Sequence, residues 1–495
     1  MSKFSEHLEQ CIIDSGMTEK HLAKVSGFNR SYIALMKNGQ RVSPDTGKMM
    51  KLFQALSLPP YECDKMWSEY IRARVGDDIY ERNHAVIDLM ESFGSISNTS
   101  IKSFYRHEIP DIKTADNRMD LEYLIKAVIE QEAVKRNGSI HIIMQADVPI
   151  LKNILPYICK NNKELRIDHI ICMDSQIGSG YEQDQLYNIK MLKSLMPIVI
   201  FSDSENYRIY HYYDCVKSHF SKVSLMPYMV LTDDYVISMN AQMNKGIIFR
   251  EKEIIALYEK LFQEHKRGCR LLLKRIKDQT DIYDYYKPGN CMGEVVYTIA
   301  QQPCFGVLKV EGMVRKYSIR GNEKRRILLE NMLRRNEKLI SSGQIRTVSY
   351  CTKKGLQRFA KEGTVDELPG EMYHKLEVYD RLDILRKLLE VIRQGKYELY
   401  LLGEYRIDFP KELIISSHGV TDATLMYLSD DAKARFILNE NSLTKTLYEF
   451  FQDFAKSPQI SSAEKAALYI EQLIEELNGI GEREKTKSIT GDLKE

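Results

Sequence analysis

The first hundred residues carry apolar side chains at helical spacing. Between 17 and 39 the pattern predicts two short helices joined at Gly27, a residue that adopts positive φ at little cost. Thr18 and Asn29 stand where their side-chain oxygens would cap the first turn of each helix. The buried face of this pair is expected to consist of Leu22, Ala23, Val25, Ile33 and Met36.

Three further helices are predicted before residue 94. The first, at 44–58, ends before two consecutive prolines, which disfavour helical backbone in the preceding residue. The next two, at 61–74 and 78–93, each carry one apolar stripe. Trp67, the one tryptophan of the chain, lies on the first of these stripes. We expect it to be part of an ordinary core, with a contact to a second subunit as the alternative.

After a polar linker at 94–100, the pattern alternates helices with short β-branched and aromatic runs. Helices are expected at 121–135 and, in a strongly charged segment, at 322–340. Strands are expected at 139–144, 167–173, 197–201, 226–231, 306–311, 313–319 and 346–351. This order predicts a large α/β or α+β body.

Two segments of the body are similar to each other. GIIFREKEIIALYEKLFQ at 246–263 and ARFILNENSLTKTLYEFFQ at 434–452 each lead from a short strand into a helix with Leu-Tyr-Glu and then Phe-Gln. A helix followed by a strand also lies upstream of each, at 121–144 and 381–402. Two related units would explain this similarity. Chance likeness of two amphipathic helices is the alternative. The units would span roughly 118–268 and 376–456.

Residues 3–58 resemble the lambda-repressor and Cro-like (xenobiotic-response-element type) helix-turn-helix domain of transcriptional regulators. The resemblance rests on the order of helix, glycine turn, second helix and the Lys-Asn-Gly-Gln-Arg exit at 37–41. It implies that the second helix enters the major groove of double-stranded DNA. The residues expected to face the bases are Arg30, Ser31, Tyr32 and Leu35, and those near the DNA backbone are Thr18, Glu19, Asn38 and Arg41. Asn29 and Lys37 also belong to the expected DNA-binding set.

Two residues depart from the family pattern. The family often has glutamine where this chain has Glu19, and a polar residue where it has Leu35. A carboxylate does not favour a phosphate contact, and Leu35 can read a base only through an apolar contact such as a thymine methyl. Two alternatives accept the helices but not the DNA: a plain helical subdomain, and a domain of this fold that binds protein.

Composition indicates a globular protein. Hydrophobic residues make up 43% of the 495 and charged residues 28%, with a net charge of +2. Residues 1–58 hold eight Lys and Arg against five Asp and Glu, a local balance of +3. That bias supports a small docking face for DNA and argues against a broad nucleic-acid groove.

The chain shows no sign of a membrane or secretory segment. No run approaches the roughly 20 apolar residues of a membrane span, and the N-terminus has no apolar signal region, so a cytoplasmic protein is expected. Nine cysteines without a CxxC pair favour reduced thiols over a disulfide framework or a zinc site. No metal and no cofactor are expected.

No catalytic motif is convincing. GxxxxGK[ST], GxSxG, HExxH and HxE with a downstream CxxC are absent. His211 near Asp214, and Asp233 with Asp234, could serve acid–base or metal chemistry, but such pairs are more often turn or surface residues. Repeated α/β units could resemble the phospholipase D architecture, yet its His-x-Lys motif with a downstream Asp is missing. The chain is therefore not expected to be an enzyme.

The expected fold is multidomain, with an all-α N-terminal helix-turn-helix domain and a large α/β or α+β body that contains two related units. The expected function is a sequence-specific DNA-binding transcriptional regulator that acts as a homodimer, whose body senses a small-molecule or protein effector or supports oligomerisation. An enzyme or a protein-interaction module fused to the helix-turn-helix is the alternative. The expected divisions are 1–58 (DNA-binding domain), 59–117 (helical connector), 118–280 (first unit), 281–375 (intermediate α+β segment), 376–478 (second unit) and 479–495 (flexible tail).

Overall fold

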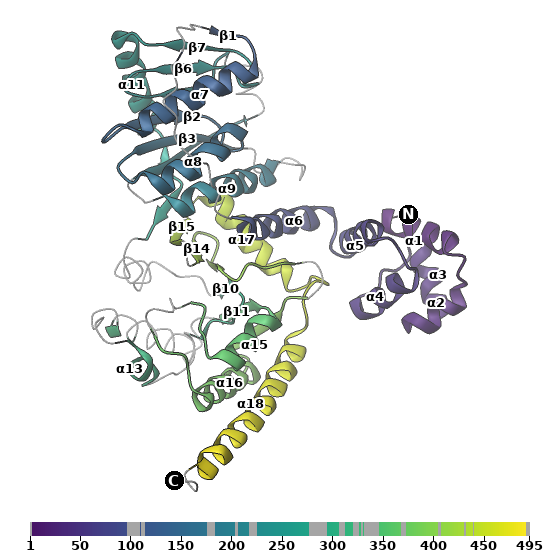
Figure 1. The fold of residues 1–495 in the computed structure, drawn as a ribbon. Helices are drawn as coiled ribbons and strands as arrows, with labels where there is room; N and C mark the ends of the chain where they lie inside the picture. Colours follow the sequence, from purple (N-terminus) through teal and green to yellow (C-terminus); the bar gives the residue numbers. More distant parts are fainter. Residues whose placement is uncertain are drawn as a thin grey trace.

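The computed structural model shows an α-helical N-terminal domain and a body built on two mixed β-sheets (Figure 1). Within the described residues, no helix has the length and apolar character needed to cross a membrane. The described residues are 2–96, 109, 114–175, 184–202, 206–216, 225–276, 295–305, 312–319, 326–327, 330, 346–367, 373–403, 407–429, 432–438 and 440–491.

Five helices share the hydrophobic core of the N-terminal domain. Trp67 lies in this core, with its ring edge-on to Phe53, as expected for an ordinary core residue. The Tyr70 hydroxyl donates to the Ser43 carbonyl at 2.8 Å, which ties the fifth helix to the turn before the fourth. The domain therefore extends past the expected boundary at residue 58. The helices are α1 (Lys3–Asp14), α2 (Glu19–Ser26), α3 (Arg30–Lys37), α4 (Thr46–Ala55) and α5 (Pro60–Val75).

Helix α6 (Asp77–Ser92) joins this domain to the body (Figure 1). Its side chains Val86 and Leu89 are fully buried in the core of the body. Arg82 forms ion pairs with Glu449, at 3.2 Å, and with Asp453. Part of the expected connector is thus a packed element of the body rather than a free spacer.

Among the described residues, the first sheet has eight strands in the order β1-β7-β6-β5-β2-β3-β4-β8. Strands β2, β3 and β4 are parallel, and β5 to β7 continue antiparallel from β2. Apolar residues of α7, α8 and α9 pack on one face of the sheet, and those of α11 on the other. The bounds are β1 (Thr114–Ala115), α7 (Arg118–Ala133), β2 (Ser139–Ile143), α8 (Pro149–Asn161), β3 (Arg166–Asp174), α9 (Asp184–Phe201), β4 (Tyr207–Asp214), β5 (Tyr228–Leu231), β6 (Val236–Met239), β7 (Gly246–Phe249), α11 (Lys252–Arg267) and β8 (Arg270–Leu271).

In the part of the chain that the structure describes, the second sheet has seven strands in the order β12-β11-β10-β13-β14-β15-β9. Strands β10, β11 and β12 are parallel, and β13 to β15 continue antiparallel from β10. The core of α15, α16 and α18 lies against β12, while α17 belongs to the core shared with the first unit. The bounds are β9 (Leu273–Arg275), β10 (Val295–Ile299), α13 (Met313–Tyr317), β11 (Arg346–Cys351), α15 (Lys353–Glu362), α16 (Val378–Arg393), β12 (Tyr397–Leu401), β13 (Leu413–His418), β14 (Ala423–Leu428), β15 (Lys433–Leu438), α17 (Asn441–Phe454) and α18 (Ala463–Gly491).

The two sheets repeat one topology. In each, three parallel strands are followed by three antiparallel strands on the side of the first, and then by a helix: α11 after β7, and α17 after β15. The edges match as well, since β1 pairs with β7 and β9 pairs with β15, both antiparallel. The similar segments 246–263 and 434–452 therefore occupy equivalent places in the two sheets. This equivalence favours two related units over chance likeness of two helices.

The expected limits of the second unit are wrong. Strands β10 and β11 lie in the range 281–375, yet they pair with each other and with β12 and β13 of the range 376–478. The expected match between 121–144 and 381–402 is also wrong, because β2 is the first parallel strand of its sheet and β12 is the third. The boundary at 376 divides one sheet.

The structure corrects three further expectations. The run 197–201 is the end of α9, which is buried on several sides, and an all-round apolar helix has no periodicity to distinguish it from a strand. Of the expected strand 313–319, residues 313–317 form α13. Helix α18 continues to Gly491, so the expected flexible tail is largely helical. The expected strand at 306–311, most of the helix at 322–340 and part of the linker at 94–100 lie outside the described residues.

Acid is expected to unfold the body through buried histidines. His169 is wholly buried, with Nδ1 2.7 Å from the Tyr207 hydroxyl and Nε2 2.8 Å from the Met144 carbonyl. Burial lowers the pKa of His169 to about 4, and also that of His211 and His418. The unfolded chain binds these protons near pH 6.5, so stability present above pH 6.5 is lost as pH falls towards 4.

Urea midpoints measured from pH 7 to pH 4 test this expectation. We expect His169→Gln to reduce the slope of stability against pH, whereas the exposed His21→Gln, on α2, leaves it unchanged. An identical slope in wild type and His169→Gln would contradict a role for this histidine.

Candidate nucleic-acid interface

Helices α2 and α3 are capped as the sequence predicts. The Thr18 hydroxyl accepts the His21 amide at 3.3 Å, and the Asn29 side-chain oxygen accepts the Tyr32 amide at 2.8 Å. Gly27 ends α2 with a φ of 76°, the left-handed conformation that favours glycine. Two short helices and a tight glycine turn are therefore confirmed as local geometry.

The buried face differs at one position. Leu22, Ile33 and Met36 are fully buried as expected, but Val25 is 45% exposed. Ser26 is buried instead of Val25. Its hydroxyl donates to the Leu22 carbonyl at 2.5 Å, so the buried polar group has a hydrogen-bond partner within the helix. A buried serine carries no apolar signal, so the hydrophobic pattern could not reveal it.

The sequence-predicted site residues gather on the outer side of α3 and at the two helix N-termini. Arg30, at the start of α3, has a side chain that is 73% exposed. The exposed members of the set are Thr18, Asn29, Arg30, Ser31, Asn38 and Arg41, and the half-buried members are Tyr32, Leu35 and Lys37. None of the nine belongs to the buried core of the domain.

Glu19 is neutralised by two of these neighbours. Its carboxylate lies 3.2 Å from the Lys37 ammonium and 3.3 Å from Nε of Arg30. The hydrogen bond from Lys37, with a smaller contribution from Arg30, holds the pKa of Glu19 below its usual value. Glu19, which departs from the family pattern, is therefore part of an ion-pair cluster with Arg30 and Lys37. This role does not require a contact with phosphate.

The cluster has different effects on its two cations. Lys37 also lies 3.5 Å from the Glu9 carboxylate, and its side chain is only 18% exposed. It holds α1, α2 and α3 together, which weakens its case as a phosphate ligand. Arg30 contacts Glu19 through Nε, and its side chain stays largely exposed. The guanidinium group of an exposed arginine has the fork of donors that matches the edge of a guanine.

The aromatic residue of the face is held by its neighbours. Tyr32 stacks on Phe28, with ring centroids 5.4 Å apart and planes 3° from parallel, and the Lys48 ammonium lies 5.7 Å from the Phe28 ring. The Ser31 hydroxyl donates to the Asn29 side-chain oxygen at 2.9 Å. These contacts fix side-chain positions before any ligand arrives, which lowers the entropy lost on binding.

The exit from α3 brings Arg41 to the same region. Gly39 has a φ of 71°, and the amides of Gln40 and Arg41 donate to the Leu35 carbonyl at 2.9 and 3.3 Å. This left-handed turn ends the helix and leaves Asn38 and Arg41 exposed. The NG exit therefore has the geometry of a helix C-cap.

The other candidates from the sequence do not form a common site. His211 and Asp214 lie three residues apart on β4, so their side chains point to opposite faces of the sheet. Asp233 and Asp234 lie 3.9 and 2.8 Å from the Lys135 ammonium. They act as ion-pair partners at the end of α7.

Comparison with known proteins adds little. No protein-family model matches the chain, and no curated protein matches it. One solved structure with some likeness is the phosphatidylserine synthase of Haemophilus influenzae Rd KW20, at 10% sequence identity and a TM-score of 0.25. The match covers 76% of this chain and 94% of the synthase. A likeness at that TM-score carries no functional argument.

Proposed function

We propose that this protein is a sequence-specific DNA-binding transcriptional regulator that uses α3 as its recognition helix. The observation that carries the proposal is the exposed Arg30 side chain, which Glu19 holds by Nε at the start of α3. A bidentate arginine at this point of a second helix suits the N7 and O6 acceptors of guanine in the major groove. Ser31 and Leu35 add a hydroxyl and an apolar contact on the same helix.

The helix ends support contacts to the DNA backbone. The N-termini of α2 and α3, at Thr18 and Asn29, carry the partial positive charge of the helix dipole. Backbone amides and capping side chains at such ends suit phosphate oxygens. Arg41, exposed after the turn at Gly39, supplies a further positive charge.

A single domain of this size reads few base pairs. Pairing two copies about a two-fold axis would double the site and match a palindromic operator, so the proposal includes a homodimer. The body is proposed to respond to a small-molecule or protein effector. Helix α6 supports that role, because it packs against α9 of the first unit and α17 of the second while leading directly from α5. A shift between the units would move α6.

Arg30→Ala is expected to weaken binding to a selected operator by about 1–3 kcal/mol, or roughly five- to 150-fold, since it removes a bidentate base contact. The measurement is a mobility shift of the full chain on operator fragments enriched from genomic DNA. Binding to unrelated DNA is expected to change much less, because phosphate contacts remain.

Arg267→Ala is a matched control, because Arg267 is an exposed arginine near the end of α11 in the body. It is expected to bind the operator like wild type. If Arg30→Ala also bound like wild type, the recognition assignment would be wrong. Binding that did not weaken as salt rises from 50 to 200 mM would argue for a protein partner instead of DNA, because phosphate contacts impose a steep salt dependence.

A further inference from the structure

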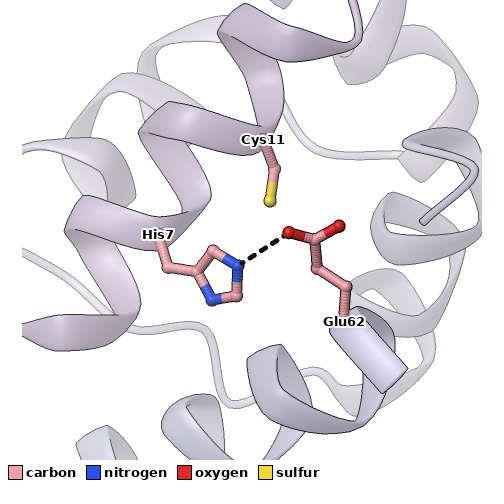
Figure 2. Close-up of side chains that lie close together, drawn as sticks. All are labelled: His7, Cys11 and Glu62. Carbon is pink, nitrogen blue, oxygen red and sulfur yellow. Dashed lines mark ion pairs between the residues drawn. The ribbon is translucent and has the colours of Figure 1, made fainter. Parts of the chain in front are cut away.

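The N-terminal domain contains a cluster of metal-ligating side chains outside the proposed DNA-binding face. His7 and Cys11 lie one turn apart on α1, and Glu62 faces them from the first turn of α5 (Figure 2). One donor atom from each of the three lies within 4.8 Å of the others. In particular, Nε2 of His7 is 3.7 Å from the Glu62 carboxylate.

The separation of the His7 and Glu62 donor atoms is close to that of a tetrahedral site. Nitrogen and oxygen ligands each about 2.1 Å from a tetrahedral zinc ion lie ~3.4 Å from one another. The observed Nε2–oxygen distance of 3.7 Å needs only a small closure. A thiolate sulfur, held at about 2.3 Å, would complete a set of three protein ligands.

A fourth residue orients the histidine. The Glu69 carboxylate lies 2.8 Å from Nδ1 of His7, on the opposite side of the ring from Glu62. A carboxylate that accepts the Nδ1 proton fixes the tautomer in which Nε2 offers its lone pair, an arrangement that accompanies most metal-ligating histidines. The same helix, α5, thus supplies both a ligand and the residue that orients another ligand.

Burial leaves one side of the cluster accessible. Cys11 is buried, and the side chains of His7 and Glu69 are 12% and 15% exposed, whereas that of Glu62 is 44% exposed. A metal ion could enter past Glu62, and water could occupy the fourth position. Without a metal, the His7 ring lies between the carboxylates of Glu62 and Glu69.

We propose that His7, Cys11 and Glu62 form a binding site for a borderline-soft divalent metal ion of the Zn²⁺ class, with Glu69 as a positioning residue. Imidazole, thiolate and carboxylate together suit Zn²⁺ and Co²⁺ better than Mg²⁺ or Ca²⁺, which prefer oxygen ligands alone. The bound ion would clamp α1 to α5. This site is independent of the proposed DNA-binding function.

Binding requires the loss of a proton. Burial and the nearby Glu62 carboxylate raise the pKa of the Cys11 thiol to about 11, so the metal-free site holds a neutral thiol. The incoming M²⁺ forms a bond to sulfur, and the thiol proton leaves to solvent. Any proton on Nε2 of His7 also leaves, since its lone pair becomes the ligand.

The test titrates chelator-treated full-length protein with Co²⁺, whose bond to a thiolate gives a charge-transfer absorption. We expect one equivalent of Co²⁺ to bind with this absorption and to be displaced by Zn²⁺. Cys11→Ser should lose the absorption. Cys269→Ser, at a half-buried cysteine after α11 in the body, should keep it. Absence of the absorption in wild type, or its full retention in Cys11→Ser, would overturn the proposal.

Two further variants decide the matter if Cys11→Ser does not fold. Glu62→Gln, at an exposed side chain, should weaken Co²⁺ binding at least tenfold, and Glu69→Gln should weaken it about 10- to 100-fold through loss of the positioning contact. Zn²⁺ should raise the Tm of wild type more than that of Glu62→Gln, because a ligand that binds only the folded state stabilises it. Equal Co²⁺ affinity and equal Tm shifts in wild type and Glu62→Gln would also overturn it.

Discussion

Phe451→Ala is expected to destabilise the body by about 3–5 kcal/mol, the range for removal of a large buried aromatic side chain. Phe451 lies on α17 with no exposed surface, at the centre of an aromatic cluster. Its ring stacks on Tyr297 at 5.5 Å and on Tyr350 at 5.8 Å, residues of β10 and β11. Alanine would leave a cavity in place of the ring. The stacking contacts and the apolar surface that the ring buries would both be lost.

The loss should reach both units. One continuous core joins residues of the first sheet with Tyr297, Tyr350 and α17 of the second, so the units are expected to unfold together. The measurement is the urea midpoint followed by far-ultraviolet circular dichroism, with hydrogen exchange in β3 and β11 as the readout for each unit. If the variant exchanged faster than wild type in β11 but at an unchanged rate in β3, a shared core would be contradicted.

Leu257→Ala is the matched control for Phe451→Ala. Leu257 lies on α11, the counterpart of α17, but is 55% exposed. Its truncation should change stability by no more than about 0.5 kcal/mol. Similar losses in the two variants would mean that burial does not explain the Phe451 effect.

Gly355→Ala is expected to destabilise the second unit by about 3 kcal/mol, although alanine favours a helix over glycine by roughly 0.5–1 kcal/mol. Gly355 lies in the first turn of α15, where an added Cβ would lie 1.8 Å from the Gln301 carbonyl oxygen. Backbone atoms on both sides would have to move apart. Steric overlap therefore outweighs helix propensity.

The displacement would also break hydrogen bonds. The Thr352 hydroxyl accepts the Gly355 amide at 2.9 Å, and the Thr352 amide donates to the Gln301 carbonyl at 3.1 Å. Each such bond contributes about 1 kcal/mol. The first bond caps α15, and the second joins the start of α15 to the segment that follows β10. The urea midpoint of the variant measures the loss of both bonds together with the clash.

Gly479→Ala tests the same substitution without the clash. Gly479 is a helical residue of α18, and a Cβ there meets no atom within 4 Å. It should be neutral or stabilising by up to about 1 kcal/mol. A Gly355→Ala variant as stable as Gly479→Ala would show that β10 and α15 can separate freely.

Local signals in the sequence were enough to predict the two helices and the turn of the proposed DNA-binding face. Caps at Thr18 and Asn29, the turn at Gly27 and the exit at Gly39 depend on residues a few positions apart, and the structure has them in the expected places. The ion pairs of Glu19 needed the fold. They join α2 to α3, and the partners of Lys37 lie on α1 and α2.

The metal cluster was missed for the same reason. The sequence predicted no metal site, because His7 and Cys11 on one helix lack the spacing of a known motif and Glu62 is about fifty residues away. Packing of α1 on α5 is what brings them together. A histidine and a cysteine one turn apart on a half-buried face was the available signal.

The sequence by itself determined the helical N-terminal domain, about half of the strands described in the body and the likeness of 246–263 to 434–452, since these follow from the period of apolar residues and from short-range turn chemistry. Tertiary structure alone decided which strands share a sheet and where the second unit begins. It also decided that Leu447 of α17 is buried and that Leu257, at the matching position of α11, is exposed. Helices α6 and α9 cover α17, and contacts between residues hundreds of positions apart leave no periodic trace in the chain.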